Sequence, residues 1–357
     1  MLYQTKNPHG GDIYSEPICL DFSSNTNPFG TAPAVVAAVR QALTQAHHYP
    51  DPYCRELVSA IGKHEGVSEA DILCGNGAAE LIYSYCEAVK PKTALELAPT
   101  FSEYALGAER HGCIVDRYFL NQGEDFALDG QFLDYVRRTK PEVIFLCNPN
   151  NPTGRLIPQE LLGEILDLCK RFGIRLFLDE CFLDFTESGR SLKGEISGHP
   201  ALFILKAFTK NYAMAGIRLG YGMCSDHGLL SQMASTVQPW NVSLLAQAAG
   251  AAALQDTEFL QRAKTLIAEQ RPRMQAELER LGFRVCPSDG NFLLFYGREG
   301  LDRMLRKQGI AIRNCENYHG LSAGWYRAAV RLTEENKMLT DAIAQVCGKE
   351  QAWQKTL

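Results

Sequence analysis

The chain has 357 residues, of which 46% are hydrophobic and 22% charged, and its formal net charge at pH 7 is −5. A globular composition at this length can build one large folded unit and a smaller one. The acidic balance, without a basic stripe, argues against nucleic acid as a partner. No stretch approaches the roughly 20 apolar residues that span a membrane.

The N-terminal sequence MLYQTKNPHGGDIY has no apolar run of the signal-peptide type, so we expect a cytoplasmic protein. Twelve cysteines are scattered from Cys19 to Cys347, and no pair has the C-x-x-C spacing of a metal or redox site. Several of them, such as Cys74, Cys147 and Cys181, lie in apolar runs, where a free thiol behaves as a small hydrophobe. We therefore expect reduced, buried thiols and no metal centre.

From about residue 31 the sequence alternates between helical and strand patterns. Helical spacing of apolar residues occurs at 32–46, 54–66 and 158–173, and short apolar runs of the buried-strand type occur at 93–98, 142–149, 174–182 and 201–208. Pro158 and Gly173 punctuate the third of these helices, one near its start and one after its end. Alternating strands and helices predict an α/β fold with a mainly parallel sheet and helices on both faces.

The last hundred residues have a different organisation. A long helical pattern over 256–281 precedes strand-like segments at 283–297, 310–315 and 326–333, with a short helix around 301–308 and a final helix. We expect a smaller α+β domain here, with a boundary near Gly250. The predicted division is an N-terminal arm (1–30), a large domain (31–250) and a small domain (251–357).

Two loops that follow predicted strands carry a possible anion site and a rigid turn. In CGNGAAEL, Gly75 and Gly77 precede a helix, so the backbone N–H groups of Ala78 and Ala79 could face an anion. A plain helix entry is the alternative. CNPNNPTG, which contains Asn151, has the composition of a rigid turn. Such loops lie where an α/β sheet binds its ligand.

Two further loops contain charges in apolar surroundings. FLDECFLDF ends a strand with Asp179 and Glu180, carboxylates that are costly in a core without a partner. FTKNYAMAGIRLGYG holds Lys210 and Arg218 among apolar and small residues. These cations are either two charges satisfied at a sheet edge, or an imine-forming amine with an arginine that holds an anionic group of the same cofactor.

Taken together and in this order, the four loops resemble the fold-type-I pyridoxal phosphate enzymes, the aspartate aminotransferase superfamily. The resemblance runs from His9 to Arg331 and is closest to the branch that contains threonine-phosphate decarboxylase and histidinol-phosphate aminotransferase. It implies that Lys210 forms the imine with pyridoxal phosphate, that Arg218 binds the cofactor phosphate, and that Asp179 keeps the pyridine nitrogen protonated.

The same resemblance assigns the remaining cofactor contacts. It implies that Asn151 hydrogen-bonds the ring O3′, that Phe101 stacks on the ring, and that Ala78, Ala79 and Thr209 contribute phosphate contacts. Tyr49, in HHYPDPY, matches a tyrosine that reaches the phosphate in the neighbouring subunit, which implies a homodimer with shared active sites.

Two positions depart from the family pattern. Ala207 stands three residues before the lysine, where the family usually has Ser or Thr, so one phosphate donor is missing. Phe182 stands three residues after Asp179, where aminotransferases usually carry Tyr, so O3′ lacks a phenol donor. The second departure argues against a simple aminotransferase.

The N-terminal NPHGGDIYSEPICLDFSSNTNPFG and the C-terminal IRNCENYHGLSAGWYRAAVR resemble the decarboxylase side of the branch. His9 and the flexible Gly10 could close over a substrate phosphate, although a histidine in such an arm is otherwise a solvated tail. The resemblance implies that Arg331 binds the substrate carboxylate and that Asn25, Asn151 and Asn317 contact the substrate.

We therefore expect decarboxylation of L-threonine O-3-phosphate to aminopropanol phosphate, which supplies the cobalamin nucleotide loop. An aminotransferase acting on histidinol phosphate, or a related amino acid, is the main alternative, and serine phosphate differs from threonine phosphate by one methyl group. A cofactor-binding regulatory domain ranks last, since we find no DNA-binding segment.

Overall fold

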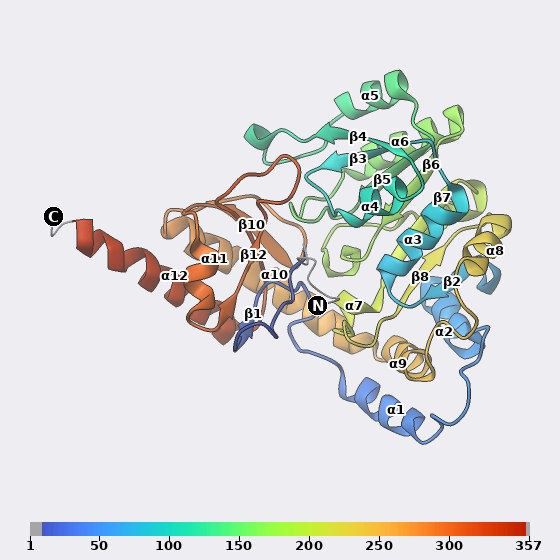
Figure 1. The fold of residues 1–357 in the computed structure, drawn as a ribbon, viewed down its shortest axis with the longest axis horizontal. Helices are drawn as coiled ribbons and strands as arrows, with labels where there is room; N and C mark the ends of the chain where they lie inside the picture. Colours follow the sequence, from blue (N-terminus) through green and yellow to red (C-terminus); the bar gives the residue numbers. More distant parts are fainter. Residues whose placement is uncertain (1–8, 355–357) are drawn as a thin grey trace.

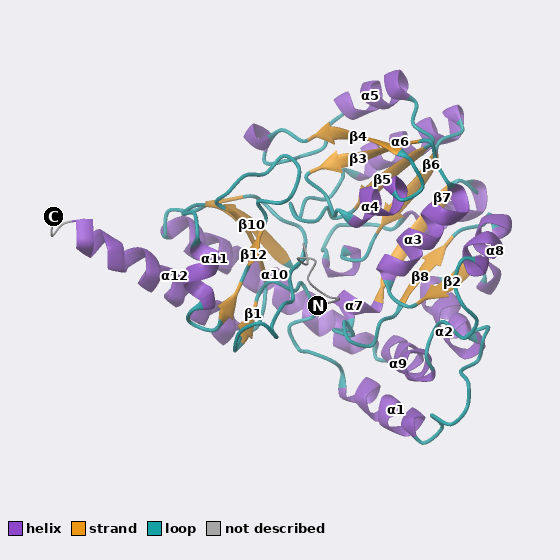
Figure 2. Ribbon diagram, in the orientation of Figure 1, coloured by secondary structure: helices purple, strands orange, loops and turns teal. Residues whose placement is uncertain are grey.

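The computed structural model describes residues 9–354, and side chains are described for 9–348. A seven-stranded sheet forms its larger part, in the order β2-β8-β7-β6-β5-β3-β4. The strands are β2 (Ile72–Gly75), β3 (Thr93–Ala98), β4 (Ile114–Phe119), β5 (Val143–Cys147), β6 (Arg175–Asp179), β7 (Leu202–Ala207) and β8 (Gly220–Met223). Strand β8 runs opposite to the other strands of this sheet, which are parallel to one another, so the predicted mainly parallel sheet is confirmed (Figures 1 and 2).

Helices cover both faces of this sheet because β5, β6 and β7 are apolar on both sides. Phe145, Phe177 and Phe203 pack towards α3 (Ala78–Val89), α4 (Glu103–Glu109) and α8 (His227–Ser235). Their neighbours on the same strands, such as Ile144 and Ile204, pack towards the helices of the opposite face. Those helices are α2 (Arg55–Glu65), α5 (Gln131–Thr139), α6 (Gln159–Phe172) and α9 (Leu244–Gln255).

Helix α6 shows how local sequence sets an element's limits. It begins after Pro158 and ends at Gly173, whose φ of 68° is left-handed. Glycine adopts that conformation without the steric cost of a side chain, so the helix ends there as predicted.

The smaller part contains a four-stranded antiparallel sheet in the order β12-β13-β10-β9. Its strands are β9 (Arg284–Val285), β10 (Phe292–Tyr296), β12 (Arg313–Asn314) and β13 (Trp325–Ala329), and its helices are α10 (Thr257–Arg280), α11 (Leu301–Arg306) and α12 (Thr333–Gln354). Figure 1 shows this part beside the large sheet, with α12 pointing away from it. The expected smaller α+β unit is therefore present.

The predicted strand at 310–315 is divided between two sheets. Its first half, β11 (Ile310–Ala311), pairs in parallel with β1 (Leu20–Asp21), whereas β12 pairs with β13. The N-terminal segment thereby joins the smaller part, where Phe22 is fully buried in its core. The first eight residues of the predicted arm lie outside the described residues. Gly250 lies within α9, and the domain boundary near it remains a proposal.

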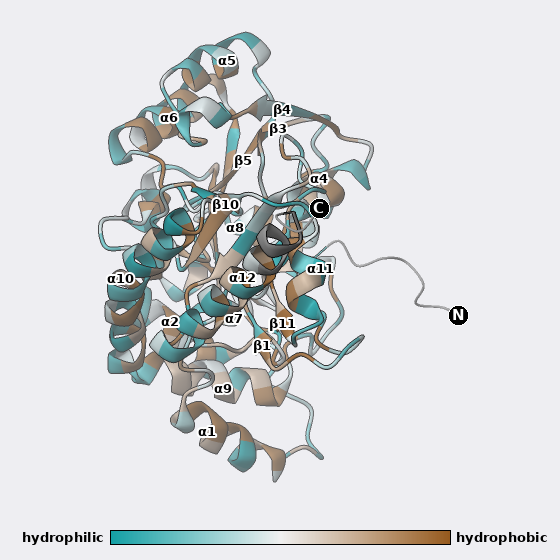
Figure 3. Ribbon diagram, turned by 90° about the vertical axis from the view of Figure 1, so that its left-hand side faces the viewer, coloured by the Kyte–Doolittle hydropathy of each residue, from teal (hydrophilic) through white to brown (hydrophobic). Residues whose placement is uncertain are grey.

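Two other segments complete the chain. Helix α1 (Pro33–Leu43) packs on α9 at the edge of the molecule, and hydrophobic stretches run along it (Figure 3). The one-turn helix α7 (Phe208–Asn211) follows β7 directly. Within the described residues, most of the twelve cysteines are buried, although Cys19 is exposed. The same residues contain no helix able to cross a membrane and no group of potential metal ligands.

Candidate active site

A cavity of about 190 Å³ opens at the carboxyl ends of β5, β6 and β7, beside the N-terminus of α3. Eight of the residues proposed as cofactor contacts line it: Ala78, Ala79, Phe101, Asn151, Asp179, Thr209, Lys210 and Arg218. Ile82, Tyr104, Cys147, Cys181, Phe182 and Ala207 complete the lining. The fold thus brings together residues from five separate stretches of sequence, as expected where parallel strands end at one edge.

One end of the cavity suits an anion. Gly77 precedes α3 with a φ of +94°, and a Cβ there would lie 2.7 Å from Arg218 Nη2. Gly220 is equally constrained, because its Cβ would lie 2.7 Å from the Ala78 nitrogen. The two glycines let the guanidinium and the helix N-terminus approach each other closely. A helix N-terminus with a nearby arginine is a favourable site for phosphate.

The opposite end holds a carboxylate. Asp179 ends β6 with 5% of its surface exposed, and burial raises its pKa above the ordinary value. Hydrogen-bond donors support the ionised form: besides the Cys181 thiol, the Tyr104 hydroxyl lies 2.6 Å from Oδ2, and the Cys181 backbone N–H lies 2.9 Å from Oδ1. Asp179 can therefore face a cationic ring nitrogen.

Lys210 lies between these ends, on α7. Burial, with the nearby charge of Arg327 next in effect, lowers the pKa of its amine to about 8. The amine lies 5.6 Å from the centre of the Phe182 ring. Backbone hydrogen bonds fix this turn, since the Asn27 N–H donates to the Lys210 carbonyl at 2.8 Å. An amine with a lowered pKa loses its proton more readily than that of an ordinary lysine, and imine formation requires the neutral amine.

Lys206, which lies on β7, is held in its charged form by two carboxylates. Its Nζ lies 3.0 Å from Glu65 Oε1 and 3.2 Å from Asp184 Oδ1. Burial opposes its charge, but these carboxylates raise its pKa above the ordinary value. Side chains of successive strand residues point to opposite faces, so Lys206 leaves β7 on the side away from the cavity. Its amine is therefore a structural cation and a poor nucleophile.

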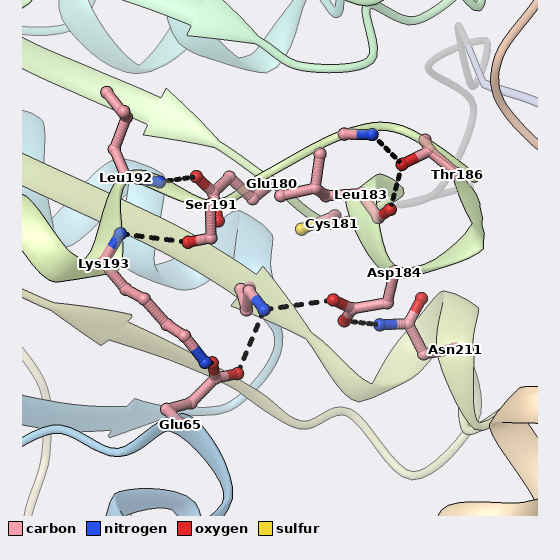
Figure 4. A network of polar contacts seen from close by, with 12 residues as sticks. Glu65, Glu180, Cys181, Leu183, Asp184, Thr186, Ser191, Leu192, Lys193 and Asn211 are labelled. Carbon is pink, nitrogen blue, oxygen red and sulfur yellow. Dashed lines mark hydrogen bonds and ion pairs between the residues drawn. The ribbon is translucent and has the colours of Figure 1, made fainter. Parts of the chain in front are cut away.

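The network around Lys206 reaches the cavity loops through Asp184 and Asn211. The Asn211 amide donates to Asp184 Oδ2 at 2.6 Å, which ties the segment after Asp179 to the turn that carries Lys210 (Figure 4). Glu65, at the other end, also accepts from Lys193 at 2.8 Å and from Tyr221 at 2.5 Å. Burial would raise the pKa of Glu65, but Lys206 and these donors lower it to about 2.

Glu180, which follows Asp179, points away from the cavity and into this same network (Figure 4). It is fully buried, and its Oε1 accepts from the Leu192 N–H at 3.1 Å. Its Oε2 has no hydrogen-bond partner among the residues described, and burial raises its pKa to about 7. The two adjacent carboxylates singled out in the sequence thus lie in different environments, and only Asp179 lines the cavity.

Arg327, which contacts the cavity residue Asn151, is absent from the sequence-based set. It lies in the middle of β13 with 6% of its surface exposed. One terminal nitrogen contacts Asn151 Oδ1, and the other lies 2.8 Å from the Ser23 carbonyl oxygen. A charged residue inside the apolar strand segment WYRAA was the available signal, because such a charge needs a buried partner.

Arg331 occupies a different environment. Its guanidinium makes two contacts of 3.1 Å with Glu335 and one of 3.3 Å with the Asp21 carbonyl, and it lies over the Phe22 ring. It does not line the cavity. Arg327 does not line the cavity either, but its guanidinium contacts Asn151, which does. The expected carboxylate contact of Arg331 stays a prediction.

The N-terminal arm reaches the mouth of the cavity. His9 Nε2 lies 2.6 Å from Glu103 Oε1, and its ring lies 5.4 Å from that of Phe101. The Gly11 N–H donates to Ser23 Oγ at 2.8 Å. Gly10 lies so close to Ser23 that a Cβ would be 2.6 Å from the Ser23 carbonyl oxygen. The arm is therefore seated beside both Phe101 and the residue that holds Arg327.

Of the remaining predicted residues, Asn25 is buried, whereas Asn317 and Tyr49 lie on the surface. Asn25 is buried, and neither atom of its amide has a hydrogen-bond partner among the described residues, as expected of a group that awaits a ligand. Asn317 lies on the surface, where it accepts from Arg313 at 2.7 Å. Tyr49 is 77% exposed, stacks on Trp240 at 4.4 Å and does not line the cavity of its own chain.

These residues fit pyridoxal phosphate. The α3 N-terminus and Arg218 suit its phosphate, Asp179 suits its ring nitrogen, Phe101 suits a ring face, and Lys210 suits its aldehyde. Ala207 also lines the cavity and adds no hydroxyl there. A larger hollow of about 590 Å³ beside α3, which includes Glu80 and Glu87 in its lining, offers no comparable lysine and carboxylate pair.

Comparisons with known proteins show the family of the chain. Residues 17–343 match the family described as aminotransferase class I and II. The threonine-phosphate decarboxylase of Salmonella typhimurium is 35% identical over 350 residues, which cover 95% of this chain and 96% of that protein. The histidinol-phosphate aminotransferase from Clostridium acetobutylicum has a TM-score of 0.86 and 30% identity, with 92% of this chain and 99% of that chain covered. A histidinol-phosphate aminotransferase from Sinorhizobium meliloti, solved with pyridoxal-5′-phosphate, has a TM-score of 0.83 and 24% identity, with 93% and 91% covered.

Proposed function

The chain belongs to the aminotransferase class I and II family and is a pyridoxal phosphate enzyme, and within that family we propose that it decarboxylates L-threonine O-3-phosphate. The product is aminopropanol phosphate, a precursor of the cobalamin nucleotide loop. The observation that carries the proposal is the seated N-terminal arm, in a chain similar to a threonine-phosphate decarboxylase along nearly its whole length.

The substrate has two anionic groups, and the site offers two places for them. Arg327, held by Asn151 and Ser23, is the proposed receptor for the carboxylate, in place of Arg331. The planar guanidinium suits a carboxylate because it can donate two parallel hydrogen bonds. We assign the phosphate to the His9 arm and Asn25, whose buried amide lacks another described partner.

When bound, pyridoxal phosphate supplies an electron sink for the bond that breaks at the substrate's Cα. Asp179 holds a proton at the ring nitrogen, so that the sink keeps its positive charge. Lys210 Nζ is the group in the cavity that can carry a proton to Cα after the carboxylate leaves. Phe182 offers an apolar ring beside that amine where a phenol would offer a hydroxyl.

We also propose a homodimer in which Tyr49 reaches the partner's cofactor phosphate. Tyr49, Tyr53 and Trp240 are large aromatic residues that are exposed in the single chain, with 77%, 68% and 45% of their surfaces accessible. Val36 and Leu43 on α1 are exposed as well, on the hydrophobic helix at the edge of the molecule (Figure 3). Exposed apolar groups gathered in this way favour an interface.

The test is to incubate the purified holoenzyme with phosphothreonine, phosphoserine and histidinol phosphate, with and without 2-oxoglutarate. Release of CO₂ and transfer of the amino group are followed separately. The proposal predicts CO₂ from phosphothreonine without a keto acid. Amino transfer from histidinol phosphate to 2-oxoglutarate without CO₂ would favour the alternative, an aminotransferase, for which the similarity to the Clostridium acetobutylicum protein is the supporting observation.

A further inference from the structure

A tyrosine outside the predicted set makes the shortest side-chain contact to Asp179. The Tyr104 hydroxyl donates to Asp179 Oδ2 at 2.6 Å, and both side chains are buried. We propose that Tyr104 is the positioning residue that keeps Asp179 ionised and aimed at the cofactor's ring nitrogen. The inference rests on the cofactor and is independent of which substrate the enzyme uses.

The orientation of Tyr104 is set by packing on three sides. Its ring stacks on Phe145 at 5.7 Å with an interplanar angle of 8°, and meets the edge of Phe101 at 5.7 Å and 79°. Phe177 closes a third side at 6.1 Å. Close packing around a buried aromatic ring holds it in the orientation that directs its hydroxyl at the carboxylate. Because Phe101 is the proposed stacking ring, one side chain supports two cofactor contacts.

The hydrogen bond acts on the charge of Asp179. Burial destabilises the carboxylate, and a phenol O–H that donates to an ionised oxygen compensates for part of that cost. The backbone donor, the Cys181 N–H, serves Oδ1 at 2.9 Å, so Tyr104 is the side-chain hydroxyl that serves Oδ2. Without it the pKa of Asp179 should rise, and a protonated Asp179 cannot hold a proton on the ring nitrogen.

A neighbouring tyrosine provides a matched control. Tyr85 is also fully buried and contacts the same two rings, Phe145 and Phe177, edge-on at 6.2 and 4.8 Å. Its hydroxyl has no hydrogen-bond partner among the residues described and does not line the cavity. Tyr104→Phe and Tyr85→Phe therefore remove the same atom from the same aromatic cluster, but only the first removes a donor to Asp179.

The experiment compares both variants as holoenzymes. For Tyr104→Phe, the acidic limb of kcat/KM and the pH titration of the cofactor's visible absorption should move up by about one to two pH units, the equivalent of losing a charged hydrogen bond. The apoprotein's Kd for pyridoxal phosphate should rise about tenfold by the same reasoning. Tyr85→Phe should leave all three measurements unchanged.

A double-mutant cycle then separates positioning from general packing. In an Asp179→Asn background, which has no carboxylate to ionise, Tyr104→Phe should cause no further shift in the absorption titration. The proposal is overturned if Tyr104→Phe leaves the titration and the Kd unchanged. It is equally overturned if the shift persists in the Asp179→Asn background, or if Tyr85→Phe produces the same shift.

Discussion

Replacement of Arg327 by lysine tests the assignment of the carboxylate site most directly. Lysine keeps a positive charge, but it is a single point donor and cannot hold Asn151, Ser23 and a substrate carboxylate together. Arg327 Nε has no hydrogen-bond partner among the described residues, so part of the guanidinium is available to a ligand. The change therefore removes donors without removing charge.

The expected magnitude follows from the number of hydrogen bonds lost. A hydrogen bond to a charged group contributes about 1.5–3 kcal/mol, which corresponds to roughly 10- to 150-fold in binding. We expect Arg327→Lys to raise KM for phosphothreonine by about that factor. Cofactor absorbance should remain, because the phosphate, ring-nitrogen and lysine contacts come from other residues.

The product serves as a control ligand. Aminopropanol phosphate keeps the amine and the phosphate of the substrate but has no carboxylate, so its binding to Arg327→Lys should stay within about threefold of wild type. Steady-state kinetics gives KM, and inhibition by the product gives its Ki. Arg331→Lys is the matched variant, since its guanidinium pairs with Glu335 four residues on. A partly exposed pair of this kind contributes only about 0.2–1 kcal/mol, and lysine keeps its charge, so kcat/KM should hardly change.

The assignment fails if Arg331→Lys loses phosphothreonine affinity while Arg327→Lys keeps it, which would restore the arginine first expected from the sequence. Equal losses for substrate and product in Arg327→Lys would also refute the reasoning. In that case the arginine would act on the phosphate or on the general shape of the site, and not on the carboxylate.

Borohydride reduction of the holoenzyme should attach the cofactor to Lys210, and Lys210→Ala should abolish turnover. A peptide map with the label on Lys206, the ion-paired lysine of β7, would contradict this assignment. Glu180 has a folded-state pKa of about 7 against an ordinary value near 4.5, so the unfolding free energy should fall as pH rises between these values. Glu180→Gln should therefore stabilise the protein more at pH 8 than at pH 5, and the difference between the two stabilisation energies should be at most about 3 kcal/mol. An equal change in Tm at both pH values would disprove this prediction. Gly10→Ala should lower phosphothreonine turnover about tenfold, because the added Cβ would lie 2.6 Å from the Ser23 carbonyl oxygen. Gly163 has open space around it, so Gly163→Ala should leave turnover unchanged. Equal turnover in the two variants would argue against the seated arm.

Most of the proposed cofactor contacts could be singled out in the sequence because they follow recognisable strands. Asp179, Asn151 and Lys210 each come at the end of an apolar run of the buried-strand type or shortly after it. Parallel strands end at one edge of a sheet, so polar residues at these ends must gather there. The position of a motif at the end of a parallel strand can therefore be predicted from the sequence.

Residues whose roles depend on long-range packing could not be assigned in this way. Arg327 and Arg331 are four residues apart in YRAAVRLT, and local pattern does not distinguish them. The pairing of β13 with β10 and β12 points Arg327 at Asn151, whereas Arg331 lies beyond the strand and meets Glu335 on α12. The division of 310–315 between two sheets has the same origin, since β11 forms only where β1 is available.

Composition, periodicity and the ordered loops determined the parallel sheet, the smaller α+β part and the family resemblance, because these properties repeat locally along the chain. The tertiary structure alone decided which of two lysines has a lowered pKa and which of two arginines contacts Asn151. It also placed Tyr104, 75 positions away in sequence, against Asp179. Charge state and donor direction depend on burial and on partners brought together by folding, and a linear pattern does not contain them.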